Sequence, residues 1–294
     1  MPETASFDSA GFDSAGFDSA AVTLGDLTFD VRVAGPADGP PIILLHGFPQ
    51  TSRCWNTVGA ELAGDGMRVL LPDQRGYSPG ARPPEVEDYR IHHLRSDVLG
   101  ILDAFGVDDA HIVGHDWGSS VAWHVAAHHP ARVRSLTALS IPHLAAFGQA
   151  LREDDDQKAR STYFSLFREA GKAEHVLLAD DAHLLRTLYG EGVATDAIDE
   201  YVRVFREPGA LTAALDWYRA MTPATGDLPP VEVPTTYIWS TDDAAVGRFA
   251  AELCSDFVDA DYTFEVLDGV SHWVPDEAPG AVTAAIRAQV RQGR

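Results

Sequence analysis

The residues best suited to do chemistry form a short run in the middle of the chain, Gly114-His115-Asp116-Trp117-Gly118. An apolar segment at residues 110–113 precedes this run, and a segment with helical character at residues 119–129 follows it. This order predicts a strand, a sharp turn and a helix, with small residues flanking a strained backbone. Such a turn lifts its central side chain out of the sheet, so Asp116 would present a carboxylate to a substrate.

Glycine and aspartate are also ordinary turn residues, so this pattern needs support from elsewhere in the chain. A carboxylate nucleophile needs an imidazole to activate water and a second acid to orient that imidazole. Asp243 follows an apolar run at residues 235–239, and His272 follows another at residues 262–267. Both are therefore expected at strand ends. Asp242 would exchange roles with Asp243 after a shift of one residue, and the spacing after Trp239 favours Asp243.

The elements that must position these residues alternate along the 294-residue chain. Alternating polar and apolar residues at 22–33 predict a hairpin about Gly25-Asp26. Continuous apolar runs predict buried parallel strands at 41–45, 68–71, 110–113, 133–139, 235–239 and 262–267. Helices are expected at 56–63, 92–105, 119–129, 247–257 and 279–290. This alternation predicts an α/β fold with a mostly parallel, doubly wound sheet.

Residues 142–230 interrupt the alternation, because they contain helical segments and no convincing strand. They predict a helical cap, inserted over the strand ends of a core made of residues 21–141 and 231–294. Residues 7–20 repeat the unit Phe-Asp-Ser-Ala-Gly, and we expect residues 1–20 to be a disordered tail. The alternative is a docking peptide with Phe7, Phe12 and Phe17 as anchors.

Taken together, four motifs resemble the epoxide hydrolase branch of the α/β-hydrolase superfamily over roughly residues 22–289. They are His46-Gly47-Phe48-Pro49, Gly114-His115-Asp116-Trp117-Gly118, Trp217-Tyr218-Arg219 and Ser271-His272-Trp273. The resemblance implies an α/β-hydrolase fold in which Asp116 is the nucleophile and Asp243 and His272 form the charge pair.

The resemblance also implies an oxyanion hole made by the backbone N–H groups of Phe48 and Trp117. Two cap tyrosines would hold the epoxide oxygen. Tyr218 matches the second, and Tyr163 matches the first more loosely, because Arg168 and Ala170 replace the usual Gln and Pro. Tyr189 and Tyr201 compete with Tyr163 for that role. The expected lining of the substrate pocket is His46, Pro49, Trp217 and Trp273. His46 and His115 are also expected to orient the backbone through hydrogen bonds, since neither has the spacing of a metal ligand.

The implied reaction is hydrolysis of an epoxide to a vicinal diol, with no metal or organic cofactor. A haloalkane dehalogenase is the alternative, although it commonly has Asn where this chain has Phe48. A fluoroacetate-type dehalogenase would have Arg in place of Trp117. A hydrolase fold retained only for binding would show a damaged triad, and a serine esterase would need serine at position 116.

Composition limits the possible partners. The net charge of −22 comes from 44 acidic and 22 basic residues, which argues against nucleic acid and anionic membranes as partners. Either a high-GC genome or adaptation to salt would account for this balance. There is no apolar run of the length that crosses a membrane, and the only two cysteines, Cys54 and Cys254, favour a cytoplasmic location. We therefore expect a small hydrophobic epoxide as the partner, and we predict no oligomeric state.

Overall fold

A single sheet forms the centre of the computed structural model, which describes residues 5–7 and 15–292. Among these residues the sheet has nine strands in the order β1-β2-β3-β5-β4-β6-β7-β8-β9. They are β1 (Ala5–Phe7), β2 (Asp18–Leu24), β3 (Leu27–Ala34), β4 (Pro41–Leu45), β5 (Arg68–Pro72), β6 (Ala110–His115), β7 (Val133–Leu139), β8 (Thr235–Asp242) and β9 (Tyr262–Ser271). The pairs from β1 to β5 along the sheet are antiparallel and the remaining pairs are parallel. The predicted α/β-hydrolase fold is confirmed.

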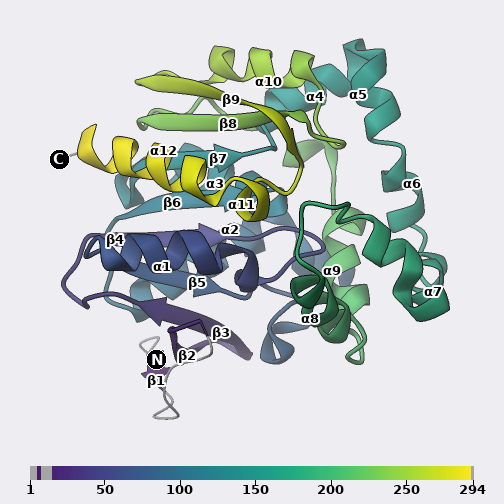
Figure 1. Ribbon diagram of the computed structural model, residues 1–294, viewed down its shortest axis with the longest axis horizontal. Helices are drawn as coiled ribbons and strands as arrows, with labels where there is room; N and C mark the ends of the chain where they lie inside the picture. Colours follow the sequence, from purple (N-terminus) through teal and green to yellow (C-terminus); the bar gives the residue numbers. More distant parts are fainter. Residues whose placement is uncertain (1–4, 8–14, 293–294) are drawn as a thin grey trace.

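The central strands are continuous apolar runs because helices cover both faces of the sheet. Every residue of β6 is buried, as are all residues of β4 after Pro41. In Figure 1, α1 (Asn56–Gly64) and α12 (Pro279–Gln292) lie in front of the sheet, and α2 (Ile91–Ala104) and α3 (Trp117–His128) lie behind it. The parallel register places Gly114 of β6 opposite Leu45 of β4, so these two strands end side by side.

Short helices complete the core. The α-helices are α10 (Arg248–Leu253) and α11 (Val274–Glu277), and the 3₁₀ helices are η1 (Ser52–Trp55), η2 (Pro79–Ala81), η3 (Val86–Tyr89), η4 (Pro130–Arg132) and η6 (Cys254–Phe257). A further 3₁₀ helix, η5 (Pro223–Thr225), lies in the inserted segment between β7 and β8. The predicted helix at 247–257 is therefore α10 followed by η6.

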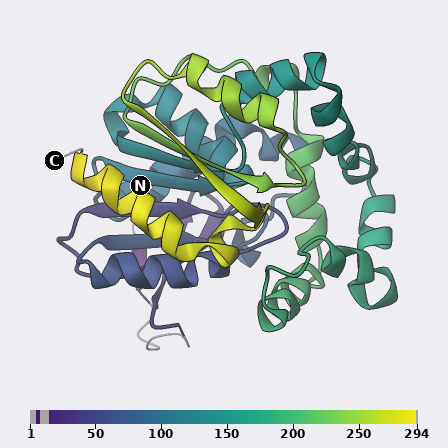
Figure 2. The same ribbon diagram turned by 45° about the horizontal axis from the view of Figure 1, so that its top comes forward.

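Six α-helices, here called the cap, lie between β7 and β8 in the chain. They are α4 (Leu144–Glu153), α5 (Asp155–Arg160), α6 (Tyr163–Phe167), α7 (Lys172–Thr187), α8 (Thr195–Phe205) and α9 (Ala210–Arg219). Figures 1 and 2 show α5–α9, in teal and green, beside one end of the sheet. Four residues inside α7, Ala179–Ala182, leave helical geometry. The cap thus lies at the edge of the sheet where the parallel strands have their carboxyl ends.

The N-terminal segment corrects one prediction. Residues 1–4 and 8–14, which include Phe12, lie outside the described residues. The last part of the expected tail is ordered, however, because Phe17 is only 1% exposed and β2 begins at Asp18. The Phe17 ring fits against Gly59 of α1, where the missing side chain leaves room for it. Phe17 therefore belongs to the core, and the expectation of a disordered tail over residues 1–20 was wrong both at its C-terminal end and at Ala5–Phe7, which form β1 and pair with β2.

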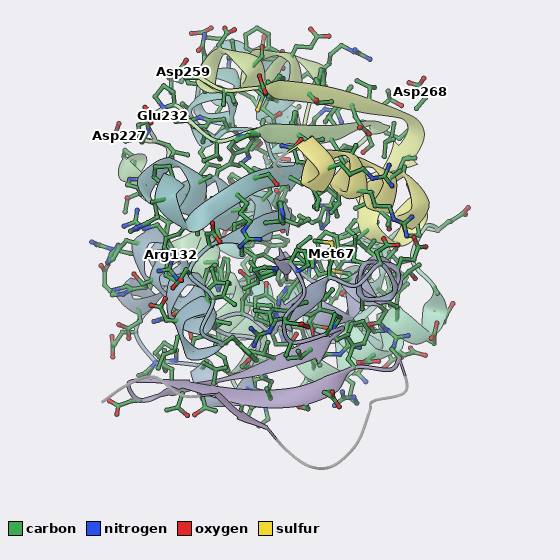
Figure 3. All side chains as sticks on the ribbon, turned by 90° about the vertical axis from the view of Figure 1, so that its left-hand side faces the viewer. Met67, Arg132, Asp227, Glu232, Asp259 and Asp268 are labelled. Atoms are coloured by element: carbon green, nitrogen blue, oxygen red, sulfur yellow. The ribbon has the colours of Figure 1, made fainter. Side chains whose placement is uncertain are left out.

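Acidic side chains are spread over the surface. Figure 3 views the end of the molecule away from the cap and shows Asp227, Glu232, Asp259 and Asp268 at its periphery, all of them exposed. Met67, labelled nearer the centre, is buried. Among the described residues, no helix has both the length and the apolar character needed to cross a bilayer.

Candidate active site

Asp116 lies at the sharp turn between β6 and α3, as the sequence predicts. Its backbone has φ 53° and ψ −122°, a conformation that non-glycine residues rarely adopt. The turn can close because Gly118 has no side chain, since a Cβ atom there would collide with the carbonyl group of Leu45. The strained turn directs the Asp116 carboxylate to the cavity between sheet and cap, where only 4% of the residue is exposed.

His272 lies between two carboxylates. Its Nδ1 is 3.0 Å from Oδ1 of Asp243, and its Nε2 is 3.5 Å from Oδ2 of Asp116. Asp243 is completely buried after β8, whereas Asp242 is exposed, so the geometry favours Asp243 over its neighbour. Burial alone would lower the pKa of His272, but the carboxylates of Asp243 and Asp116 raise it to about 10. The imidazole is therefore protonated at neutral pH.

Asp243 keeps its negative charge despite its burial. Burial alone would raise the pKa of its carboxyl, but His272, the Ser140 hydroxyl and the N–H of Ala245 hold the pKa below its ordinary value. Oδ1 accepts hydrogen bonds from the N–H groups of Ala245 and Val246, at 2.7 and 3.1 Å. These bonds fix the carboxylate that orients His272.

Ser140 belongs to the same group, and the sequence reasoning missed it. It follows β7 with φ 67°, and its hydroxyl donates to Oδ2 of Asp243 at 2.6 Å and lies 3.0 Å from Nδ1 of His272. The only sequence signal is a serine directly after a buried strand, a pattern that many strands share. Its importance emerges only where β7, β8 and β9 end together.

The loop after β4 supplies a donor to the Asp116 carboxylate. The N–H of Phe48 donates to Oδ1 of Asp116 at 2.8 Å, and a Cβ atom at Gly47 would occupy the place of that carboxylate. The N–H of Trp117, in the first turn of α3, has no acceptor among the described residues. Of the two backbone donors predicted from the resemblance, that of Phe48 contacts the carboxylate, and the role of the Trp117 N–H stays a prediction.

Two cap tyrosines face Asp116 across the cavity. Tyr163 of α6 and Tyr218 of α9 have ring centroids 6.2 Å apart, and both line the large cavity of about 930 Å³ together with Asp116. Burial, together with the negative charge of Asp116, raises the pKa of each hydroxyl well above its ordinary value. Both hydroxyls therefore keep their protons at neutral pH.

The two tyrosines that compete with Tyr163 are not available to a substrate in the cavity. Tyr189 lines the cavity, but its hydroxyl donates to the carbonyl of Pro49. Tyr201 is fully buried and does not line the cavity. Of the three tyrosines considered for this position, the geometry favours Tyr163.

The predicted pocket lining is partly wrong. Pro49 and Trp273 line the large cavity, but His46 and Trp217 do not. The His46 ring turns inward, where Nε2 accepts from the N–H of Gln74 at 3.2 Å. The Trp217 indole N–H donates to the carbonyl of Arg75 at 2.9 Å. Both side chains satisfy buried polar groups of the core, so neither contacts a ligand in the cavity.

His115 holds the loop that carries His272. Its Nε2 lies 2.8 Å from the carbonyl oxygen of His272, and burial lowers its pKa to about 4. The neutral ring therefore donates from Nε2, as expected for a residue that orients the backbone. Among residues 5–7 and 15–292, no group of three His, Cys, Asp or Glu side chains could hold a metal ion.

Comparisons with known proteins agree with this geometry. A family model described as "alpha/beta hydrolase fold" matches residues 40–279. Epoxide hydrolase A of Mycobacterium tuberculosis is 31% identical over 293 residues, a match that covers 86% of this chain and 91% of that protein. The chain belongs to the epoxide hydrolase branch of the α/β-hydrolase superfamily.

Other members of the superfamily match over similar lengths. The AB hydrolase superfamily protein YfhM of Bacillus subtilis is 34% identical over 272 residues, covering 90% of this chain and 95% of that protein. A solved epoxide hydrolase from hot-environment metagenomes superposes with a TM-score of 0.82 at 31% identity, covering 93% of this chain and 98% of its own. Epoxide hydrolase A of Mycobacterium thermoresistibile has the same TM-score at 26% identity, with coverage of 94% and 98%. The likeness therefore spans core and cap.

Proposed function

We propose that this enzyme hydrolyses an epoxide to a vicinal diol through a covalent ester on Asp116. The observation that carries the proposal is that the Asp116 carboxylate has a backbone donor, an imidazole and two tyrosine hydroxyls around it. Oδ1 of Asp116 accepts from the Phe48 N–H, Oδ2 is 3.5 Å from His272, and two tyrosines share the cavity. A nucleophile, a base and acids that can serve a leaving oxygen thus meet at one site.

In the first step, Oδ2 of Asp116 attacks one epoxide carbon and the strained C–O bond breaks. The released oxygen takes a proton from Tyr163 or Tyr218, because an alkoxide is a poor leaving group until it is protonated. This step leaves an ester on Asp116, a tyrosinate and a protonated His272. The imidazolium proton then passes to the tyrosinate through solvent, which leaves His272 neutral.

The second step uses the change of charge at Asp116. Esterification removes one of the two negative charges that raise the pKa of His272. The neutral imidazole can then take a proton from water, and the hydroxide attacks the ester carbonyl carbon. The N–H groups of Phe48 and Trp117 would bind the oxyanion that forms. Collapse breaks the ester bond, and the proton of the added hydroxyl passes to the departing oxygen. The diol is thus released, and the Asp116 carboxylate is restored beside a protonated His272.

The cavity lining indicates the charge of the substrate. Five carboxylates contribute to it, and His272 is its only basic side chain among the described residues. These carboxylates belong to Asp116, Glu191, Asp242, Asp276 and Glu277. The walls around Asp116 are aromatic, including Phe48, Phe167 and Trp273. The substrate is therefore a neutral epoxide with an apolar substituent, because a carboxylate on it would meet uncompensated negative charge.

The test removes both hydroxyls, as Tyr163→Phe with Tyr218→Phe, and follows diol and halide release in parallel. Epoxide turnover should fall by about 10²- to 10⁴-fold, the usual contribution of general acid catalysis. Each single variant should lose less, because the other tyrosine can still donate. Tyr201→Phe is the matched control, since its buried hydroxyl lies outside the cavity and has no partner among the described residues.

Wild-type turnover of epoxides by the double variant would contradict the proposal. So would wild-type release of bromide from alkyl bromides at a much higher rate than epoxide opening, because halide needs no proton to leave. Faster release of bromide than of diol would identify a haloalkane dehalogenase.

A further inference from the structure

A second cavity, of about 280 Å³, lies between the start of α2 and the end of α3. It does not include Asp116, His272 or either cap tyrosine. Its basic side chains are Arg90, His92, Arg95, His124 and His128, and its only carboxylate among the described residues is Asp227, at the periphery in Figure 3. This is an unusual concentration of basic groups in a chain with a net charge of −22. We propose that this cavity binds a phosphate dianion, either free or as the head of a small phosphate monoester.

The start of α2 supplies the first argument. No side chain caps this helix, and the N–H groups of Ile91 and His92 have no acceptor among the described residues. Its first turn contains no acidic residue, although negative charge is what a helix N-terminus favours. Arg90 and Arg95 place positive charge there instead. A bound anion would satisfy the free N–H groups and reverse this unfavourable electrostatic arrangement.

Arg95 supplies the second argument. No hydrogen bond or ion pair of its guanidinium group is found in the described part of the chain, and its Nε is buried without a partner. Burial lowers the pKa of Arg95, yet an arginine stays charged in proteins. The arginine therefore carries an uncompensated, partly desolvated charge beside the cavity. Two parallel N–H groups of a guanidinium match two oxygens of a phosphate.

His124 supplies the third argument. It is 3% exposed and lines the cavity; its Nε2 lies 3.0 Å from the carbonyl of Thr225, while its Nδ1 is buried with no partner. Burial lowers the pKa of His124 to about 4 against the opposing hydrogen bond to Thr225, and the positive charge of Arg95 acts in the same direction as burial. A dianion in the cavity would oppose the effect of Arg95. Phosphate binding should therefore raise the pKa of His124.

Two of the basic side chains that line this cavity already have partners within the protein. His128 lies in the last turn of α3, and its Nδ1 is 3.1 Å from the carbonyl of His124, so it already has a hydrogen-bond partner within that helix. Arg90 forms an ion pair with the exposed Glu87 and so contributes only in part. Arg95 and the free N–H groups of α2 have no such explanation, and they define the proposed site.

The experiment titrates inorganic phosphate, and separately glycerol 3-phosphate, into the full-length protein at constant ionic strength. Binding is followed by calorimetry and by the histidine side-chain signals in NMR. Arg95→Gln should weaken binding by about 10-fold or more, since it removes a charge-assisted contact. Arg152→Gln is the matched control, because Arg152 is an exposed arginine outside this cavity. This control should bind as the wild type does.

Tighter binding of glycerol 3-phosphate than of phosphate would identify a monoester as the occupant, and the reverse would identify free phosphate. The proposal is overturned if wild type binds neither, or if Arg95→Gln and Arg152→Gln weaken binding equally. It is also overturned if saturating phosphate leaves the pKa of His124 unchanged. A melting curve checks that Arg95→Gln is folded.

Discussion

Ser140 connects Asp243 to the imidazole of His272, the proposed base, because its hydroxyl contacts both. The substitution Ser140→Gly removes this hydroxyl, and glycine suits the backbone φ of 67°. Loss of a hydrogen bond to a buried charge should slow hydrolysis of the alkyl-enzyme by about 10- to 100-fold. Alkylation should change far less, since Asp116 keeps its contacts. Single-turnover kinetics separates the two steps, and equal slowing of both would contradict this role.

The charge of Asp116 controls the protonation of His272. Two carboxylates raise the pKa of His272 to about 10 against the opposing effect of burial. Asp116→Asn removes one negative charge, as esterification would, so the protonated imidazole loses stabilisation and its pKa should fall. An NMR titration of His272 in both proteins measures the difference. An unchanged pKa would mean that Asp116 does not control the base.

The types and order of Asp116, Asp243 and His272 could be predicted from the sequence, because each follows an apolar run that forms a strand. The direction of a side chain could not. His46 and Trp217 belong to motifs beside the cavity, but buried acceptors and donors in the core turn both away from it. Ser140 was missed because its two partners come from strands about 100 or more residues further along the chain.

At the scale of elements, β4, β5, β6 and β7 were predicted nearly to the residue, since strands buried on both faces leave continuous apolar runs. The start of α3 was placed two residues late, at Ser119, because the turn at Asp116 leads directly into the helix. The role of Phe17 was not predictable from its repeat. Three copies of one unit share the same local sequence, so the packing of Phe17 against α1 could not be inferred from the repeat itself.

The substitution Phe17→Ala tests whether the end of that repeat belongs to the core. Phe17 is 1% exposed, so its removal should lower the free energy of unfolding by about 3–5 kcal/mol. The matched control is Phe249→Ala in α10, at a position that is 41% exposed, where the change should stay within about 0.5 kcal/mol. Denaturant unfolding measures both variants. If both substitutions changed the free energy of unfolding by the same small amount, Phe17 would not belong to the core.

At the scale of the whole molecule, the site is complete only where core and cap meet. The core supplies Asp116, Asp243 and His272 from three strand ends, and the cap supplies Tyr163 and Tyr218 from two helices. The two proposed steps use these parts differently. Ring opening needs the tyrosines and the carboxylate, whereas release of the diol needs the imidazole. A defect in His272 should therefore stop the cycle at the ester.

Intact mass spectrometry of His272→Gln after incubation with an aryl epoxide tests this claim most directly. The account predicts a stable adduct with the mass of one epoxide, which peptide mapping places on Asp116. The double variant His272→Gln with Asp116→Asn, treated in the same way, should form no adduct. An adduct on another residue, or continued release of diol without an adduct, would contradict a covalent ester on Asp116.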